Sequence, residues 1–225
     1  VSPDFAIVEQ EPFSVAGAQW GLALTRAAVP FALQHDENRR TSWPLPVRMW
    51  RRALLERASF TMARSPRAAE LLADVVDASR APLIPHPIPV WAQAARPSTP
   101  RSPFTIGFAG RLVESKGLRD LVGAARLLSD VRLLIVGNGP LRQELEESGV
   151  PIELRQAASS DDMAPLYAEM DVLVLPSRTT PSWAEQFGRV LAEAAICGVP
   201  VIGSDSGEIP WVTSVLGGRT FPEGD

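Results

Sequence analysis

The sequence SRTTPSWAEQFGRVLAEAAICGVP occupies residues 177–200 and lies between two short apolar runs, at 172–176 and at 199–203. Apolar runs of this length, bounded by polar residues, glycine or proline, are typical of buried strands. Within the stretch we expect a helix that begins near Phe187-Gly188 and ends at Cys197-Gly198, because glycine commonly follows the last turn of a helix. Strand, helix and strand in this order predict a unit of a parallel sheet.

The start of this helix has the properties of an anion site. The first turn of a helix presents unpaired backbone N–H groups and a partial positive charge, and Gly188 would let a ligand approach the main chain. Glu185 precedes the helix and Glu193 lies about two turns into it, so both carboxylates could accept hydrogen bonds from sugar hydroxyls. The spacing fits either a site for a ligand with phosphate and hydroxyl groups or an ordinary surface helix with two solvated glutamates.

Composition limits the classes of protein that fit. The chain has 225 residues, 45% of them apolar, and a net charge of −4, so we expect one or two globular domains and no nucleic-acid partner. The single cysteine, Cys197, lies at an apolar helix end and is expected to be structural, and a chain without disulfides suits the cytoplasm. No apolar run approaches the roughly 18–20 residues of a membrane span, and no signal peptide is recognisable.

Apolar strands alternate with helices along the chain, which predicts parallel sheets covered by helices on both faces. Besides the two strands that flank residues 177–200, we expect strands at 5–8, 30–34, 60–63, 83–84, 104–109, 132–136 and 152–154. Helices are expected after the N-caps Ser14, Ser65 and Asp161, at 45–57 and 118–128, and after Pro140 and Pro210.

A proline-rich connector between Pro82 and Pro103 separates the two halves of the chain. We place the break near Ala95, which gives domains at 1–95 and 96–225. The sequence begins at Val1 and stops in a loop-like PEGD. We therefore expect an excerpt truncated at both ends, the alternative being a complete small two-domain protein.

Polar or glycine-rich loops follow two of the expected strands in the second half, at the carboxyl ends where open parallel sheets bind ligands. Arg111 and Lys116 would place two positive charges near one anion, unless they are solvated surface cations. Gly137 and Gly139 lie in a turn that either only reverses the chain or brings its backbone close to a nucleotide.

Two features of the first half also allow two interpretations each. His35 follows an apolar strand and is either a turn or core histidine or a residue that looks into a cleft between the domains. The expected helix 45–57 is basic and amphipathic, and its basic face is either solvated or docks on an anionic membrane surface. The arginines of this helix are Arg48, Arg51, Arg52 and Arg57.

With these residues set out, the chain resembles a group 1 (family 4) retaining glycosyltransferase of the GT-B class, in which two Rossmann-like domains with parallel sheets face each other across a cleft. The resemblance is carried by FAGRLVESKG (108–117), IVGNGP (135–140), DVLVLPS (171–177), EQFGRVLAEA (185–194) and GVPVIGSDSGEIPWV (198–212). Two glutamates separated by seven residues match the family signature. VEQEPFS, PFALQHDENRR and LIPHPIPV in the first half fit less specifically, and Gln186 departs from the glycine that many members carry.

The resemblance implies a role for each candidate residue. Catalytic roles are implied for His35, Glu185, Arg111 and Lys116, and donor-binding roles for Gly137, Gly139, Arg155, Gln156, Phe187, Gly188, Arg189 and Glu193. The two cations and the backbone N–H groups of 187–189 would hold the donor diphosphate. Glu193 would bind ribose hydroxyls, Glu185 hydroxyls of the transferred sugar, and the loops at 137–139 and 155–157 would line the base. His35 would lie by the transferred sugar.

The implied reaction transfers a hexose, with retention, from a UDP- or GDP-sugar to a hydroxyl of a glycan, a lipid-linked or a small-molecule acceptor. The cationic clamp would stabilise the leaving diphosphate, so we expect no metal and no other cofactor. Retention without an evident nucleophile favours attack on the face from which the diphosphate departs; Glu185 is the sole candidate for a double displacement. A phosphorylase, an epimerase and a non-catalytic nucleotide-sugar binding module are the alternatives. The expected location is the cytoplasm, with contact at the inner face of the membrane through helix 45–57.

Overall fold

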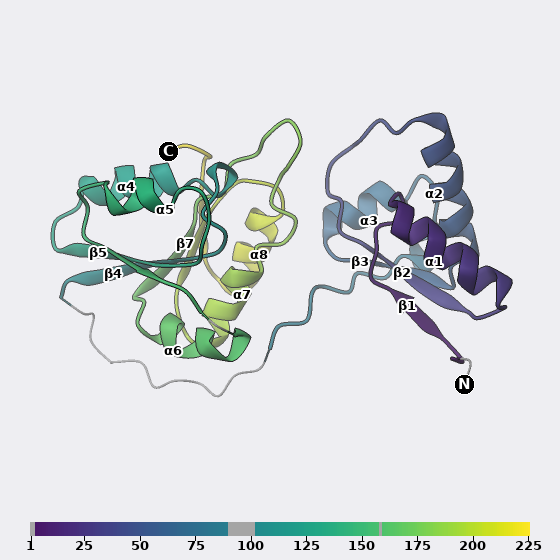
Figure 1. The fold of residues 1–225 in the computed structure, drawn as a ribbon, viewed down its shortest axis with the longest axis horizontal. Coiled ribbons are helices and arrows are strands. Elements are labelled where there is room, and N and C mark those ends of the chain that lie inside the picture. The colour runs from purple at the N-terminus through teal and green to yellow at the C-terminus, as the bar shows by residue number, and fades with distance from the viewer. Residues whose placement is uncertain (1–2, 90–101, 158) are drawn as a thin grey trace. The chain divides into compact units, whose positions relative to one another are not determined.

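The structure of the chain is a computed structural model that describes residues 3–89, 102–157 and 159–225. Contacts divide the chain into two compact units, Val1–His86 and Pro87–Asp225 (Figure 1). The division falls inside the proline-rich connector. The predicted break near Ala95 lies outside the described residues.

The second unit contains a six-stranded, fully parallel sheet in the order β6-β5-β4-β7-β8-β9. Numbered from the first strand of the unit, this order is 3-2-1-4-5-6, the doubly wound order of dinucleotide-binding sheets. The strand order reverses between β4 and β7, so the carboxyl ends of these two strands mark the place where such sheets bind ligands. The strands are β4 (Phe104–Ala109), β5 (Val131–Val136), β6 (Ile152–Arg155), β7 (Val172–Leu175), β8 (Val201–Ser204) and β9 (Arg219–Phe221).

Helices cover the two faces of this sheet (Figure 1). On one face lie α4 (Leu118–Arg126) and α5 (Arg142–Glu146), and on the other α6 (Met163–Ala168), α7 (Arg189–Ile196) and α8 (Ile209–Leu216). The interior strand β5 is accordingly apolar on both sides, with Leu133, Leu134 and Ile135 fully buried. This double burial explains why β4 and β5 read as continuous apolar runs rather than as alternating patterns.

Helix α7 begins and ends as the sequence predicted. Gly188 is its N-cap in the left-handed conformation (φ 75°), and Cys197 is its C-cap, followed by Gly198. Cys197 is a free, buried cysteine, and burial together with the charge of Glu193 raises the pKa of its thiol. A protonated, buried thiol fits the predicted structural role.

Three local predictions were wrong or incomplete. The helix predicted from Asp161 is a 3-10 turn at Ser160–Asp162 followed by α6, and its N-cap is Ser159, whose side chain and that of Asp162 form a capping box. Strand β9 was not predicted, because its three residues contain no apolar run. The strand expected at 83–84 is a single bridge between Ala63 and Leu83.

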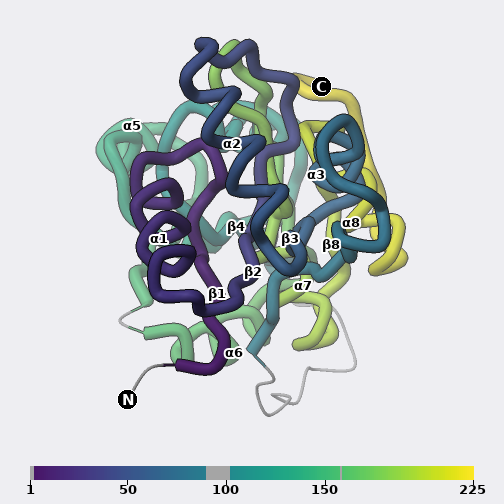
Figure 2. Tube along the Cα trace, turned by 90° about the vertical axis from the view of Figure 1, so that its right-hand side faces the viewer, coloured from purple at the N-terminus to yellow at the C-terminus, as the bar shows by residue number. Residues whose placement is uncertain are grey.

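The first unit contains the parallel sheet β1-β2-β3, formed by Ala6–Val8, Phe31–His35 and Phe60–Ala63. Its helices are α1 (Val15–Arg26), α2 (Leu45–Arg57) and α3 (Pro66–Leu72), and the predicted N-caps Ser14 and Ser65 accept hydrogen bonds from Gly17 and Ala68. Helices α1 and α2 pack side by side (Figure 2), with Leu54 of α2 filling the space beside Gly21 of α1.

Gly117, between the short helix at Glu114–Lys116 and α4, holds the loop after β4 against the end of β7. Its φ is 66°, and a Cβ at this position would lie 1.8 Å from the carbonyl oxygen of Pro176. Gly117→Ala should therefore lower the free energy of unfolding by about 1–3 kcal/mol. The matched control is Gly123→Ala inside α4, where a Cβ would meet nothing within 4 Å. That change should raise the free energy of unfolding by about 0.5–1 kcal/mol in urea denaturation, and equal effects of the two changes would contradict the assignment.

Candidate active site

A pocket of about 560 Å³ lies in the second unit, where the loops after β4, β5 and β6 meet the start of α7. Because parallel strands end at one edge of the sheet, residues far apart in sequence are brought together here. Five of the predicted donor-site residues line it, namely Arg111, Gly137, Gln156, Arg189 and Glu193. The pocket therefore contains cationic side chains, a carboxylate and exposed backbone in one place.

Glu193 is held inside this pocket by two hydrogen bonds. Its side chain is almost fully buried, and its carboxylate oxygens accept from Tyr167 Oη at 2.7 Å and from Arg189 Nε at 2.7 Å. Burial and the neighbouring charge of Glu193 raise the pKa of the Tyr167 hydroxyl, so this hydroxyl is a donor at neutral pH. The two donors fix the carboxylate in one orientation at the pocket wall.

Lys116 and Glu185 form a second cluster, at the carboxyl end of β7. Lys116 Nζ lies 2.5 Å from Glu185 Oε2, which also accepts a hydrogen bond of 2.8 Å from Ser177 Oγ. The same ammonium group lies 4.9 Å from the centre of the Trp183 ring. Both charged side chains are largely buried, with exposed fractions of 14% and 10%. Arg111 lines the pocket and Lys116 pairs with Glu185. That the two cations clamp one anion stays a prediction.

The remaining predicted residues of the second unit are not among those that line this pocket. Phe187 is buried, and its ring meets that of Trp211 edge-on at 5.9 Å, while Gly188 caps α7. Gly139 belongs to the turn beside the pocket, where its N–H donates to Asn138 Oδ1. Arg155 does not line the pocket, because its guanidinium pairs with Glu153 and Glu169, and these hydrogen bonds raise its pKa.

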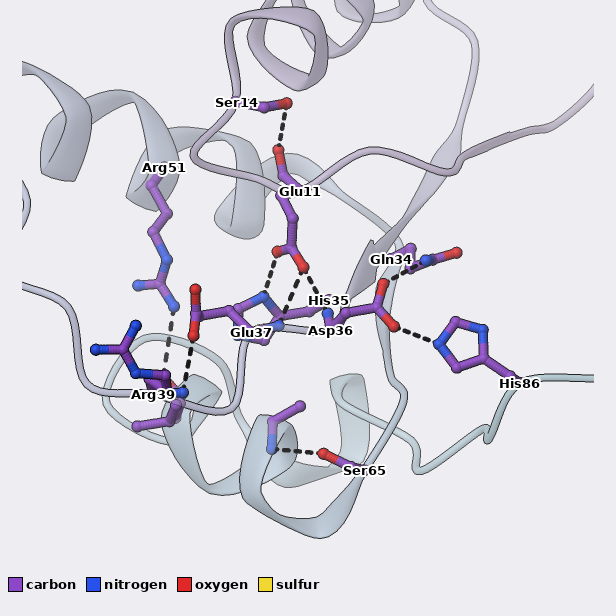
Figure 3. Close-up of polar contacts among 12 residues, drawn as sticks. Glu11, Ser14, Gln34, His35, Asp36, Glu37, Arg39, Arg51, Ser65 and His86 are labelled. Atoms are coloured by element: carbon purple, nitrogen blue, oxygen red, sulfur yellow. Dashed lines mark hydrogen bonds and ion pairs between the residues drawn. The ribbon is translucent and has the colours of Figure 1, made fainter. Parts of the chain in front are cut away.

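His35, the last residue of β2 in the first unit, is a buried histidine held by a carboxylate, which fits the interpretation as a core histidine (Figure 3). Its exposed fraction is 2%, and Nδ1 lies 2.7 Å from Glu11 Oε2. The other oxygen of Glu11 accepts from the backbone N–H groups of Asp36 and Glu37, so the carboxylate is fixed at the end of β2. The predicted place of His35 beside a transferred sugar stays a prediction.

The basic helix α2 does not present its arginines on one face. Arg51 is half-buried and lines a separate pocket of the first unit, whereas Arg52 is exposed and paired with Glu56. Contact of α2 with a membrane stays a prediction. In the described ranges, no helix combines the length and the apolar character needed to cross a membrane.

No cluster of three or more histidine, cysteine, aspartate or glutamate side chains suited to a metal ion occurs among the described residues. Metal independence stays a prediction as well.

Sequence reasoning missed three residues that organise the two clusters. Tyr167 lies 26 positions before Glu193, and Ser177 and Trp183 gave no motif of their own. A buried tyrosine usually finds a hydrogen-bond partner, so Tyr167 in an apolar helix was a signal for a polar contact inside the core. Its partner could not be found without the packing of α6 against α7.

A doubly wound parallel sheet with a polar pocket beside its switch point is typical of nucleotide-binding proteins. Residues 103–225 match the family model described as Glycosyl transferases group 1. The match covers more than half of the chain, so the chain belongs to the group 1 glycosyl transferases.

Relatives and solved structures agree with this family. A GDP-mannose-dependent alpha-mannosyltransferase of Mycolicibacterium smegmatis is 36% identical over 178 residues, which are 70% of this chain and 42% of the relative. The sulfoquinovosyl transferase SQD2 of Arabidopsis thaliana is 32% identical over 113 residues, 49% of this chain and 21% of that protein. The chain thus spans less than half the length of these curated relatives.

The crystal structure of Anabaena Alr3699/HepE in complex with UDP resembles the chain with a TM-score of 0.78, covering 99% of this chain and 65% of that one. A sucrose-phosphate synthase from Thermosynechococcus elongatus resembles it with a TM-score of 0.75 over 99% of this chain and 61% of that one. At 20% and 21% identity, these likenesses show the fold alone. The fold is the predicted α/β fold with parallel sheets, shared with GT-B glycosyltransferases.

Proposed function

We propose that the chain belongs to a retaining hexosyltransferase that uses a UDP- or GDP-sugar as donor, a hydroxyl of a carbohydrate or lipid-linked molecule as acceptor, and no metal ion. The observation that carries the proposal is the buried carboxylate of Glu193 in a pocket that also contains Arg111 and Arg189. A carboxylate accepts hydrogen bonds from ribose hydroxyls, and guanidinium groups pair with phosphate oxygens. The names of relatives and neighbours, which include a GDP-mannose-dependent enzyme and a complex with UDP, support both donor bases.

The second cluster supports a role for Lys116 and Glu185 at the reacting end of the donor. A donor diphosphate near Lys116 would share its ammonium group with Glu185, and the leaving nucleoside diphosphate would be stabilised without a metal. Glu185 Oε2 is occupied by Lys116 and Ser177, which suits a carboxylate held to accept sugar hydroxyls. This arrangement favours attack on the face from which the diphosphate leaves over a covalent intermediate on Glu185.

Nucleotide binding by the second unit tests the proposal. We expect UDP or GDP to bind the 225-residue chain in isothermal titration calorimetry, with an affinity that EDTA does not change. Glu193→Gln should weaken binding, because an amide replaces one acceptor oxygen by a donor. Failure of UDP, GDP and their glucose and mannose conjugates to bind would contradict the donor assignment.

Tyr167→Phe tests whether the orientation of Glu193 matters for the ribose. Removal of one hydrogen bond to a buried carboxylate costs about 1.5–3 kcal/mol, so UDP or GDP should bind roughly tenfold more weakly or worse. The ratio of affinities for the ribonucleotide and its 2′,3′-dideoxy analogue should also fall. Leu166→Val on the same helix α6 is the control, since it shortens a buried side chain without changing this hydrogen bond. An unchanged ratio in Tyr167→Phe would leave Tyr167 with a purely structural role.

A further inference from the structure

A tight turn at residues 180–183 brings the half-buried Trp183 to the ammonium group of Lys116. Thr180 and Trp183 form an antiparallel bridge. The N–H of Thr180 donates to the carbonyl oxygen of Trp183 at 2.7 Å, and the reverse hydrogen bond measures 3.3 Å. Pro181 occupies the second position of the turn, where its fixed φ is favourable. The backbone of Trp183 is therefore held in one place.

The chain is also fixed two residues further on, at Glu185. The carbonyl oxygen of Glu185 accepts a hydrogen bond of 2.9 Å from the backbone N–H of Glu208. Gly207 packs so closely against the same peptide group that a Cβ at this position would lie 2.1 Å from the carbonyl oxygen of Glu185. The turn and the loop after β8 thus hold Trp183 and Glu185 on a short segment that is anchored at both ends.

Trp183 and Glu185 contact the ammonium group of Lys116 in different ways. Lys116 Nζ donates to Glu185 Oε2 at 2.5 Å and lies 4.9 Å from the centre of the Trp183 ring, which is within the range of a cation–π interaction. The carboxylate balances the charge of the ammonium, so the ion pair is neutral overall. The ring attracts the same charge through its quadrupole and adds no opposite charge. Because an ammonium has three N–H donors, contact with the ring leaves donors for the oxygen atoms of a ligand.

The ring also limits the movement of a flexible side chain. Lysine carries its charge on a stem of four carbons, and the ordering of such a side chain on ligand binding costs affinity. The Lys116 side chain is only 14% exposed and lies between the Trp183 ring and the Glu185 carboxylate. Much of this ordering is therefore complete before a ligand binds.

We propose that Trp183 is a positioning residue of the sugar transfer, whose ring holds the ammonium group of Lys116 where it meets the diphosphate of the donor. Because the ring brings no opposite charge, its contact with the ammonium persists when phosphate oxygens replace Glu185 Oε2. Glu185 is then available to accept hydrogen bonds from the hydroxyls of the sugar. This inference rests on the proposed function, since it requires a diphosphate at Lys116.

The affinities of the 225-residue chain for UDP and UMP, or for GDP and GMP, test the proposal in isothermal titration calorimetry. Their ratio reports on the outer phosphate group. Trp183→Leu should lower the ratio about three- to tenfold, because the Lys116 side chain must then be ordered on binding. Trp183→Phe keeps an aromatic face and should lower it by about twofold or less. Trp20→Leu, which removes an exposed indole from α1, should leave the ratio unchanged.

The same substitution in a Lys116→Ala background separates positioning from a merely structural role. If the ring acts through the ammonium, Trp183→Leu should change the ratio no further once Lys116 is alanine. The indole N–H signal of Trp183 in ¹⁵N–¹H spectra, assigned by Trp183→Phe, is a second measurement that does not require Trp183→Leu to fold. We expect UDP to shift this signal further than UMP does, and this difference should disappear in Lys116→Ala.

The outcomes distinguish this inference from the proposed function. A ratio that falls in Lys116→Ala but not in Trp183→Leu would overturn the role of Trp183 and leave the proposed donor intact. Equal losses from Trp183→Leu in both backgrounds, or an indole difference that persists in Lys116→Ala, would also overturn it. A chain that binds neither UDP nor GDP would contradict the proposed donor and the role of Trp183 with it.

Discussion

Replacement of Lys116 by alanine is expected to lower kcat/KM for the proposed sugar transfer by about 10²–10³, the loss typical when one group that stabilises developing negative charge is removed. The ammonium group of Lys116 has little contact with solvent, and its partners are Glu185 and the face of Trp183. In such surroundings, a positive charge acts on a leaving diphosphate far more strongly than it would in water. The effect should appear mainly in kcat, because the charge on the diphosphate grows as its bond to the sugar breaks.

Arg119→Ala is the matched control for this prediction. Arg119 lies three positions after Lys116, but its guanidinium is exposed and already bound to Glu114 and Glu144. Its loss removes the same formal charge from the neighbouring first turn of α4 without touching the cluster, so kcat/KM should be unchanged. Equal losses of kcat/KM in the two variants would mean that the number of positive charges matters and the position of Lys116 does not. Full activity of Lys116→Ala would contradict the proposed stabilisation of the leaving group.

The sequence was most informative where local pattern alone determines structure. The bounds of β3, β4 and α2 match the predicted ranges, because each is an apolar or amphipathic run with a sharp polar, glycine or proline boundary. Ser14 and Ser65 were predicted as N-caps from two or three residues of context, and both accept the expected hydrogen bonds. The family motifs also lie where the fold places ligands, at the carboxyl ends of strands.

The sequence was less informative where a side chain has several possible partners. Arg155 is predicted to lie at the base, and this stays a prediction, but in the structure its guanidinium pairs with Glu169 and with Glu153, which lies two residues earlier on the same face of β6. Glu153 could be predicted as a partner from its position two residues earlier in the same strand, whereas Glu169 could not. Arg51 and Arg52 are neighbours on a helix that was read as one basic face, but the helical period turns them to different surroundings. Such choices depend on tertiary packing, which no motif encodes.

Variants of Lys116 and Glu185 should show whether this ion pair serves stability or function, through their free energies of unfolding. Glu185→Leu leaves the ammonium group of Lys116 largely buried and without its carboxylate, which should cost about 3–5 kcal/mol. In the double variant Lys116→Met, Glu185→Leu, both charges are gone and two apolar side chains can pack against Trp183. We expect it to unfold at a urea concentration close to that of the unchanged chain, which means a coupling energy of several kcal/mol between the two positions.

We expect this double variant to be stable but inactive. If the fold tolerates two apolar residues here, the two charges are not needed for stability. A charged pair retained at a place where it adds little net stability is best explained by a ligand that exchanges contacts with it. Urea denaturation of the two single variants and the double variant gives the coupling directly, and nucleotide-sugar turnover by the same proteins gives the functional half. If the loss in free energy of unfolding of the double variant equals the sum of the losses of the two single variants, the two side chains contribute independently. That result would contradict a role of the charged pair in donor binding.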